Sequence, residues 1–571
     1  MKRTGAQIVW ECLVKEGVDV IFGYPGGANL PIYDAMRDFP SVHHVLPRHE
    51  QGGAHMADGY ARVSGKVGVA MGTSGPGATN LVTGIATAHM DSIPMVFITA
   101  QVSSKLIGYD AFQETDVTGI TLPITKHNYL VTDVNEIMPT MREAFYIARS
   151  GRPGPVLVDI SKDAQQATIE NWQYDESPIR LKGYRPDMRP ASASIQNAVQ
   201  MINAARRPLI LAGHGVLMSN SMEELRTFSE MANVPVAVTL LGIGAMPASH
   251  PLNLGMMGMH GESWVNNAIQ EADLLLAFGM RFDDRVTGNL KTYAQKAKKI
   301  HIEIDPSEIN KNVKVDLGLV GDLKDILRQI IPLLGSGERS EWTTHIMEMK
   351  GDSSVRDIQN LPDNGHLYAA HVINDLWRFA NPDTVITTDV GQHQMWSAQY
   401  YRVERPHRWV TSGGLGTMGF GLPSAIGAKF ASPKSEVWTI VGDGGFQMTA
   451  AELSTAAQEG IKVNIAIINN GFLGMVRQWQ EFFYDKNYAA TPLKSPDFVK
   501  LAEAHGLKGI RVTERSQVEA AIREAQATEG TVVIDFRVEQ EDTVYPMVPA
   551  GADLNAMIRR PSVLVETPQD L

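Results

Sequence analysis

At 571 residues the chain is too long for a single hydrophobic core, so the sequence predicts several domains. Its 44% hydrophobic and 20% charged residues are typical of folded globular proteins and exclude wholesale disorder. The net charge is −12 and no run of Lys and Arg forms a basic stripe, which argues against nucleic acid as a partner.

The N-terminal segment MKRTGAQIVWECLVKEG is predicted as an amphipathic helix and lacks the features of a signal or transit peptide. No apolar stretch reaches the length of a membrane span, so no membrane partner is expected. The single cysteine, Cys12, excludes an internal disulfide framework and a thiolate metal cluster. These observations predict a cytoplasmic enzyme.

Three blocks then repeat one pattern of apolar strand, Gly-rich turn and helical stretch. The first, residues 1–165, contains the strand candidates VDVIFGYPG, VGVAMGTSG, PMVFITA and PVLVDI. A polar, proline-containing segment, residues 164–190, is predicted as a linker. The second block, residues 190–334, contains RRPLILAGHG, VPVAVTLLGIG, ADLLLAFGMRFDD and KKIHIEIDP.

A second polar connection is expected over residues 335–364. The third block, residues 365–540, carries TVITTDVGQ, RWVTSGGLG, EVWTIVGDGG, VNIAIINNG and TVVIDFRV, and residues 541–571 are predicted as a tail that lies over the surface or covers a site. The pattern predicts an α/β protein with three doubly wound domains, each built on a parallel sheet covered by helices.

The strongest chemical signal is a pair of polar motifs, each directly after an apolar strand. Gly442-Asp443-Gly444 follows EVWTIV, and Asn469-Asn470 follows VNIAII. One right-handed crossover would place both strand ends at the carboxyl edge of a parallel sheet, where ligands bind. Because Mg²⁺ prefers oxygen ligands and phosphate, we predict that Asp443, Asn470 and the Phe472 carbonyl hold a magnesium-bound diphosphate. Either motif alone would be an ordinary turn, and their joint position favours the metal site.

A glycine motif upstream has two interpretations. Gly414-Leu-Gly416-Thr-Met-Gly419 matches the GxGxxG pattern of dinucleotide-binding folds, with Glu436 near the acidic position, but the pattern is weak by itself. The downstream metal motif favours a close-packed cofactor turn. The strand end Asp389-Val390-Gly391-Gln392-His393 would supply further phosphate contacts, although His393 alone is equally compatible with a surface turn.

A carboxyl group in the first block is the candidate for activating the cofactor. If the diphosphate belongs to thiamine diphosphate, an acid must exchange a proton with the pyrimidine ring, and it works best in an apolar pocket. Glu50, in Arg48-His49-Glu50-Gln51-Gly52-Gly53, lies between the strand VHHVLP and a helix rich in Gly and Ala. The alternative is that Glu50 only complements the positive N-terminal end of that helix. The histidine spacing does not fit the HExxH zinc signature.

The chain closely resembles the catalytic subunits of the acetohydroxyacid synthase family, also called acetolactate synthase. The resemblance extends over nearly the whole chain. The strings that carry it are YPGGA at 24–28, RHEQGG at 48–53, TSGPGATN at 73–80, DAFQET at 110–115, GRPGPVLVDI at 151–160, RFDDRVTG at 281–288, GLGTMGFGLP at 414–423 and MVRQWQ at 475–480.

The resemblance implies that two pyruvates condense to 2-acetolactate with loss of CO₂, and that pyruvate and 2-ketobutyrate give 2-aceto-2-hydroxybutyrate, on the route to branched-chain amino acids. It implies that the first domain binds the pyrimidine of thiamine diphosphate and the third its diphosphate and Mg²⁺. By this resemblance Glu50 activates the cofactor. The other implied contacts of the cofactor are Gln392, His393, Gly416, Met418, Gly442, Asp443, Gly444 and Met475, and Met418 matches the residue that bends it into a V shape.

The resemblance also implies a structural FAD in the middle domain. The matching positions are Arg152, Gly215, Thr239, Leu240, Met257, Gly258, Met259, His260, Gly279, Met280, Arg281, Phe282, Asp283, Glu303, Ile304, Gly321 and Asp322. A homodimer is implied as the minimum, because the first domain of one chain faces the third domain of its partner, and a homotetramer is compatible. Binding of a separate regulatory small subunit, and valine inhibition through it, stay open.

Trp479 and Arg285 are the candidates for choosing the second substrate. Trp479 lies four residues after Met475, on the same face of a helix, and its indole would favour the ethyl group of 2-ketobutyrate by about 1–3 kcal/mol. Arg285 would clamp the carboxylate of the 2-keto acid. The remaining residues that match the active site are Gly27, Ala28, Phe112, Gln113 and Lys162. The alternatives are a core aromatic for Trp479 and a surface ion pair with Asp283 or Asp284 for Arg285.

One string departs from the family: QVP reads Gln101-Val102-Ser103 here. The resemblance places this position in the channel where herbicidal inhibitors bind, and loss of the proline is associated with sulfonylurea tolerance. We expect weak inhibition by sulfonylureas, and a wild-type inhibition constant no higher than that of Ser103→Pro would contradict this.

Three other functions stay open at this point. A simple 2-keto acid decarboxylase or a flavin-dependent pyruvate oxidase would use the same cofactor, but RFDDRVTG and MVRQWQ favour the synthase. A silent cofactor-binding or assembly protein would require loss of Glu50 or of the metal residues, and the sequence retains them.

Overall fold

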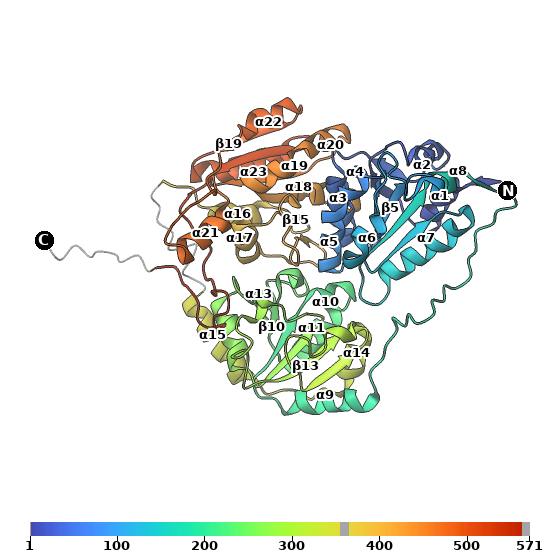
Figure 1. Ribbon diagram of the computed structural model, residues 1–571. Coiled ribbons are helices and arrows are strands. Elements are labelled where there is room, and N and C mark those ends of the chain that lie inside the picture. Colours follow the sequence, from blue (N-terminus) through green and yellow to red (C-terminus); the bar gives the residue numbers. More distant parts are fainter. Residues whose placement is uncertain (1, 354–364, 562–571) are drawn as a thin grey trace.

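The computed structural model describes residues 2–353 and 365–561 and contains three six-stranded parallel sheets, each flanked by helices (Figure 1). The prediction of three doubly wound α/β domains is confirmed. Each strand candidate named from the sequence contains a strand of one of these sheets. None of the helices in the two described ranges is long and apolar enough to cross a bilayer.

The N-terminal sheet has the strand order β3-β2-β4-β5-β7-β6. Its strands are β2 (Val20–Gly23), β3 (His43–Val45), β4 (Gly68–Gly72), β5 (Met95–Gln101), β6 (His127–Val131) and β7 (Pro155–Ser161). The helices are α1 (Gly5–Lys15), α2 (Leu30–Ala35), α3 (Glu50–Ser64), α4 (Pro76–Thr79), α5 (Val82–Asp91), α6 (Val117–Thr121), α7 (Val134–Arg149) and α8 (Lys162–Gln166). A short antiparallel pair, β1 (Arg3–Thr4) and β8 (Thr168–Ile169), joins the start of the chain to the end of this domain.

Local sequence fixes where the two key helices of this domain begin. Thr4 and Gln7 form a capping box at the start of α1, which confirms the predicted N-terminal helix. His49 caps α3, so that Glu50 is its first residue, and the helix ends at Gly65 in a left-handed conformation.

The middle sheet has the order β11-β10-β9-β12-β13-β14. Its strands are β9 (Pro208–Ala212), β10 (Val236–Val238), β11 (Asn253–Met256), β12 (Leu274–Phe278), β13 (Lys298–Glu303) and β14 (Leu317–Val320). The helices are α9 (Ser192–Ala204), α10 (His214–Met218), α11 (Met222–Ala232), α12 (Ser263–Glu271), α13 (Asp284–Thr287), α14 (Leu323–Ile330) and α15 (Ser340–Ser353). Residues 170–191, which precede it, form no helix or strand, as expected for a linker.

The C-terminal sheet has the order β16-β15-β17-β18-β20-β19. Its strands are β15 (Val385–Thr388), β16 (Trp409–Val410), β17 (Val437–Gly442), β18 (Asn464–Asn469), β19 (Lys508–Val512) and β20 (Val532–Arg537). The helices are α16 (Ala369–Phe379), α17 (Gln392–Tyr400), α18 (Gly421–Ala431), α19 (Asp443–Thr449), α20 (Leu453–Gln458), α21 (Gly474–Phe483), α22 (Phe498–Ala504) and α23 (Val518–Ala527).

One prediction about a connecting segment was wrong in part. The polar connection over residues 335–364 contains helix α15, because Trp342 and Ile346 are buried against the middle domain; residues 354–364 lie outside the described part. The tail packs against the middle domain: Val544 and Met547 are fully buried, and the Val548 amide donates to the carbonyl of Met259. Its last residues, 562–571, lie outside the described part.

Helices α3 and α18 hold the N-terminal and C-terminal domains together by direct backbone contact. A Cβ atom added at Gly59 would overlap the carbonyl oxygen of Ser424, and one added at Gly427 would overlap that of Met56. Only glycine permits this approach of two helices. In Figure 1 the two helices lie between the C-terminal and N-terminal sheets.

Candidate functional site

The predicted metal residues lie at the ends of two neighbouring strands. β17 and β18 pair in parallel, with Gly442 opposite Ile468, and Asp443 and Asn470 follow directly. This confirms the single crossover expected from the sequence. The Asn470 amide donates to Oε1 of Gln392 (3.1 Å), and its Oδ1 accepts from the amide of Phe472 (3.2 Å).

Asp443 provides the negative charge at this edge. The carboxyl group is 1% exposed, and its Oδ2 accepts from the hydroxyl of Ser495 (2.9 Å). Burial raises the pKa of Asp443 to about 6, so a cation beside it would offset the cost of keeping the carboxylate ionised. One carboxylate, one amide oxygen and one carbonyl form an all-oxygen set that fits Mg²⁺ with a phosphate. Within the described ranges there is no cluster of three His, Cys, Asp or Glu side chains arranged for a metal.

The glycine-rich turn lies next to the metal motif. Gly416 (φ +69°) and Gly419 (φ +87°) are left-handed, and a Cβ at Gly444 would lie 3.7 Å from Cε of Met418. Asp389, proposed from sequence as part of a phosphate-contacting strand end, uses its buried carboxylate to accept the amides of Gly419 and Gly421 instead. Asp389, from the same domain, therefore fixes the conformation of the turn, and the Met418 side chain lies beside the first turn of α19.

Two other predicted contacts of the diphosphate lie at the start of α17. Gln392 is buried and joins Asn470 to Gln478 of α21 through its side-chain amide. The ring of His393 is buried beside Gly442; burial lowers its pKa to about 3, and its Nε2 has no hydrogen-bond partner among the described residues. A neutral, buried and unpaired ring nitrogen fits a site that another group completes. It does not fit a surface turn.

Glu50 lies in a polar corner of the N-terminal domain. Its Oε2 accepts from Nδ2 of Asn80 (2.9 Å), and a Cβ at Gly77 would lie 3.2 Å from its Oε1. The carboxylate of Glu452 accepts the amides of Arg48 and His49, which fixes the turn before α3. In the part of the chain that the structure describes, no hydrogen bond or ion pair joins Glu50 to Asp443, Asn470 or Met418.

The two candidates for substrate choice lie together although they belong to different domains. The guanidinium carbon of Arg285, in α13, lies 6.0 Å from the centroid of the Trp479 ring, in α21. This contact is within cation–π range. Trp479 is half-buried and packs on Phe483 (5.3 Å between centroids), and Arg285 also lies 3.7 Å from the carboxylate of Asp284.

The other predicted substrate residues come from loops of the N-terminal domain. Gly27 is exposed and the Ala28 amide donates to Thr73 (3.4 Å), at the end of β4. Gln113 packs against Gly75 in a left-handed conformation (φ +61°), and Phe112 beside it is 88% exposed. Lys162 is the first residue of α8, directly after β7. Ser103 follows β5 with φ −54°, a value that proline also adopts.

The positions matched to FAD gather at the carboxyl edge of the middle sheet. Sixteen of the matching positions follow the ends of its six strands: Gly215 after β9; Thr239 and Leu240 after β10; Met257, Gly258, Met259 and His260 after β11; Gly279, Met280, Arg281, Phe282 and Asp283 after β12; Glu303 and Ile304 at the end of β13; Gly321 and Asp322 after β14. This edge is where open parallel sheets bind nucleotides.

The chemistry of this edge is compatible with a nucleotide. Gly258 (φ +103°) and Gly279 (φ +56°) are left-handed, and Gly215 touches Gly279 so closely that neither could carry a side chain. Burial raises the pKa of Glu303 to about 7 and lowers that of His260 to about 4. Arg152, the one matching position outside the sheet, reaches from the N-terminal domain to Asp305 and Glu308 just beyond β13.

The sequence matches known family models in all three domains. Residues 3–120 match the N-terminal TPP binding domain, 195–330 the central domain and 389–536 the C-terminal TPP binding domain of thiamine pyrophosphate enzymes. The chain is 50% identical over 562 residues to the acetolactate synthase large subunit of Mycobacterium tuberculosis (96% of this chain, 90% of that protein). The chain belongs to the acetolactate synthase family.

Other members of the acetolactate synthase family are similar over comparable lengths. The large subunit of Corynebacterium glutamicum is 48% identical over 564 residues (96% of this chain, 89% of that protein), and that of Buchnera aphidicola is 44% identical over 563 residues (97% and 98%). The predicted family, its three-domain α/β fold and its use of thiamine diphosphate are thereby confirmed.

Several residues that organise this synthase site escaped the sequence reasoning. Asn80 holds Glu50, Ser495 holds Asp443, and Glu452 fixes the start of α3. Asn80 ends the string TSGPGATN, so its motif was a usable signal. Glu452 and Ser495 stand in ordinary helix and loop sequence, and only the fold brings them to the site.

Proposed function

We propose that this chain catalyses the condensation of two pyruvates to 2-acetolactate with release of CO₂, and of pyruvate with 2-ketobutyrate to 2-aceto-2-hydroxybutyrate. When bound, thiamine diphosphate supplies the carbon nucleophile that attacks the keto group. The remaining chemistry is positioning, proton transfer and exclusion of competing acceptors by this chain's own side chains.

Asp443, Asn470 and the Phe472 carbonyl are proposed to hold Mg²⁺ and, through it, the diphosphate. Support comes from their position at neighbouring strand ends and from the uncompensated burial of Asp443. Glu50 is proposed to exchange a proton with the pyrimidine ring. It is 9% exposed and held at a fixed orientation by Asn80, which suits proton transfer at one atom.

The contact between Arg285 and Trp479 is the observation that favours a synthase over a simple decarboxylase. It brings a cation and an aromatic wall, from two domains, to one place. We infer that Arg285 binds the carboxylate of the second 2-keto acid and that Trp479 packs on its alkyl group. A decarboxylase has no second keto acid to bind.

FAD is proposed to bind the carboxyl edge of the middle sheet through the positions described there. Because acetolactate formation involves no net oxidation, its role is proposed to be structural. A dimer or tetramer of this chain, which would bring Glu50 of one chain to the metal site of another, is part of the same proposal.

Product analysis tests the proposal. The purified chain, supplied with Mg²⁺, thiamine diphosphate, FAD and pyruvate, should form acetolactate; with 2-ketobutyrate added, it should also form 2-aceto-2-hydroxybutyrate. Acetaldehyde as the product would identify a decarboxylase, and acetyl phosphate an oxidase. The Glu50→Gln variant should fold and bind Mg²⁺–thiamine diphosphate yet lose most turnover.

A further inference from the structure

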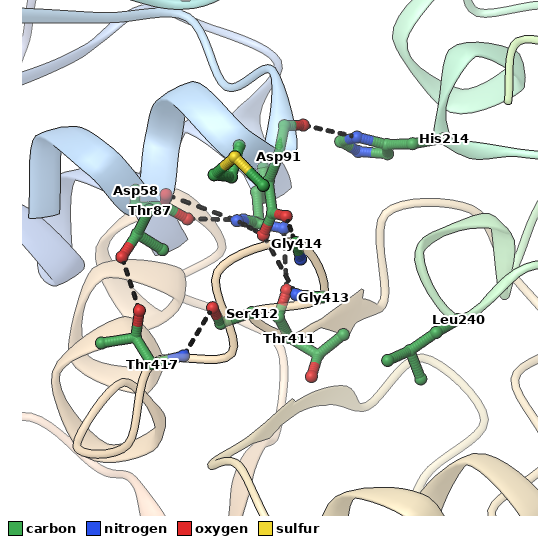
Figure 2. Close-up of polar contacts among 12 residues, drawn as sticks. Asp58, Thr87, Asp91, His214, Leu240, Thr411, Ser412, Gly413, Gly414 and Thr417 are labelled. Atoms are coloured by element: carbon green, nitrogen blue, oxygen red, sulfur yellow. Dashed lines mark hydrogen bonds and ion pairs between the residues drawn. The ribbon is translucent and has the colours of Figure 1, made fainter. Parts of the chain in front are cut away.

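The last turn of α5 lies where the three domains meet (Figure 2). The carboxylate of Asp91, the final residue of this helix, is 1% exposed. It accepts the amides of Gly413 (3.2 Å) and Gly414 (2.6 Å), which belong to the glycine-rich loop of the C-terminal domain. One buried side chain of the N-terminal domain therefore grips the loop that carries Gly416 and Met418.

An ion network supports this grip. Arg62 of α3 donates to Asp91 (2.8 Å) and pairs with Asp58 one turn before it, and its third nitrogen donates to the carbonyl of Thr411 (2.9 Å). Two buried carboxylates thus share one guanidinium. Asp58 has Arg62 as its partner, whereas Asp91 has Arg62 and the two loop amides.

Asp91 is a poor choice for the helix in which it stands. A carboxylate at the C-terminal end of a helix faces the negative end of the helix dipole, which is unfavourable, and its burial adds a desolvation cost. A residue that opposes local preference at a buried junction calls for a compensating role. The two amides of the loop are the contacts that Asp91 makes and Asp58 does not.

The loop fits this anchor closely on both sides. A Cβ at Gly414 would lie 2.7 Å from Oδ1 of Asp91, and a Cβ at Gly413 would lie 2.7 Å from Cγ of Leu241 in the middle domain. Thr87 of α5 also meets Thr417 (2.8 Å between hydroxyl oxygens). The N-terminal and middle domains therefore clamp the loop, in addition to the hydrogen bond that the Thr417 amide donates to Ser412 within the C-terminal domain.

The end of α5 is itself braced by the middle domain. A ring nitrogen of His214 lies 3.0 Å from the carbonyl oxygen of Asp91, and Arg281 donates to the carbonyl of Met90 (2.9 Å). Burial near Arg62 lowers the pKa of His214 to about 4, so its ring is neutral. The end of α5 is therefore held by Arg62 on one side and by His214 and Arg281 of the middle domain on the other.

We propose that Asp91 is a positioning residue: its carboxylate fixes the loop from Gly413 to Met418 in the conformation that binds thiamine diphosphate. The proposal rests on the proposed function of that loop. Without the carboxylate at least one of the two loop amides loses its acceptor, and cofactor binding would then have to supply the free energy that orders the loop.

The decisive comparison is between Asp91→Asn and Asp58→Asn. Both remove one charge from the same buried network around Arg62, but only the first alters the acceptor of the loop amides. Thiamine diphosphate is titrated into the FAD-loaded apoenzyme with Mg²⁺ and binding is followed by calorimetry. Asp91→Asn should bind the cofactor at least about tenfold more weakly than the wild type. Asp58→Asn should bind within about threefold of the wild type, even though both variants lose thermal stability.

Equal cofactor affinity in Asp91→Asn and wild type would overturn the proposal, as would equal loss in both variants. If Asp91→Asn fails to fold, Gly414→Ala tests the other partner, because the added methyl group displaces the loop from an intact Asp91. It should also weaken binding about tenfold, and wild-type affinity in it would overturn the proposal. If the wild-type chain itself binds no thiamine diphosphate, it is the proposed function that fails.

Discussion

Buried carboxylates in this chain occupy three environments, and each has a different consequence. Asp159 accepts from Thr99 (2.8 Å) and Gln101 (3.0 Å) and has no cation beside it among the described ion pairs. Asp91 has a guanidinium, and within the described residues the carboxylate of Asp443 has the hydroxyl of Ser495 as its one hydrogen-bond partner. A buried acid without a counter-ion favours its protonated form or a bound cation.

Asp159 should make stability depend on pH. Burial raises its pKa from 3.8 in the unfolded chain to about 6 in the folded one. Between these values the folded protein binds more protons than the unfolded chain, so stability falls as pH rises from about 4 to about 6. Relative to wild type, Asp159→Asn should therefore gain about 2 kcal/mol between pH 4 and pH 7. Urea unfolding at both pH values measures this, and a pH-independent difference would contradict it.

Asp443→Asn should bind Mg²⁺–thiamine diphosphate at least about a hundredfold more weakly, because the only carboxylate of the proposed metal set is lost. Ser495→Ala is the matched control. It keeps the carboxylate and removes only its hydrogen-bond donor, so about tenfold weaker cofactor binding is expected. Metal-dependent cofactor binding, followed by tryptophan fluorescence, separates the two. The metal assignment would be wrong if Asp443→Asn retained wild-type affinity.

Residues at strand ends were predictable, and residues that act across domains were not. Asp443 and Asn470 each follow an apolar strand, so a crossover rule alone brought them together. Asp91 closes an ordinary helix and Glu452 stands in another; their partners lie more than 300 residues away in sequence. No local pattern encodes such a pairing, because it arises from how complete domains pack.

At the scale of elements, α3 and α18 show how glycine sets the distance between domains. Gly59 and Gly427 each touch the backbone of the opposite helix. Glycine inside a helix costs about 0.5–1 kcal/mol relative to alanine, and here that cost is exchanged for close packing of the helix that begins at Glu50 on the helix that follows the glycine-rich loop.

Gly427→Ala should lower the free energy of unfolding by about 3 kcal/mol, since a methyl group cannot enter without separating the helices. Gly351→Ala is the control. Gly351 also lies in a helix, α15, but no atom of the described residues lies within 4 Å of an added Cβ, so alanine there should stabilise by about 0.5–1 kcal/mol. Thermal unfolding of the two variants should shift in opposite directions; equal shifts would show that the contact is not tight.

The sequence predicted the uniformly buried strands β5 and β18 and missed several elements whose burial is mixed. β5 and β18 are buried along their whole length and read as apolar runs. β6 and β19 lie at sheet edges, and their exposed residues interrupt the apolar signal. α15 carries many polar residues, and its packed face is marked by Trp342, Ile346 and the partly buried Met349.

At the scale of the whole molecule, the proposed acid and the proposed metal site belong to different domains. Among the described residues Glu50 is held by Asn80 and Asp443 by Ser495, with no hydrogen bond or ion pair between the two sets. A second copy of the chain would complete the site if the N-terminal domain of one chain faces the C-terminal domain of the other.

Mixing two inactive variants tests this arrangement. Glu50→Gln and Asp443→Asn each disable every site in their own dimers. If sites form between chains, a mixed dimer contains one site with both changes and one without either, so random reassortment should restore about 25% of wild-type activity. Each variant mixed with itself is the control. No recovery after confirmed subunit exchange would place the complete site within one chain.

The packing of α3 on α18 predicts what happens when the segment that leaves the N-terminal domain is cut. Arg180 and Lys182 stand exposed in residues 170–191, where no helix or strand protects the backbone. A trypsin cut there would yield two bands on a denaturing gel. The glycine-lined seam of α3 and α18 would nevertheless keep both pieces in one particle, so covalent continuity at this point is dispensable for holding the synthase together.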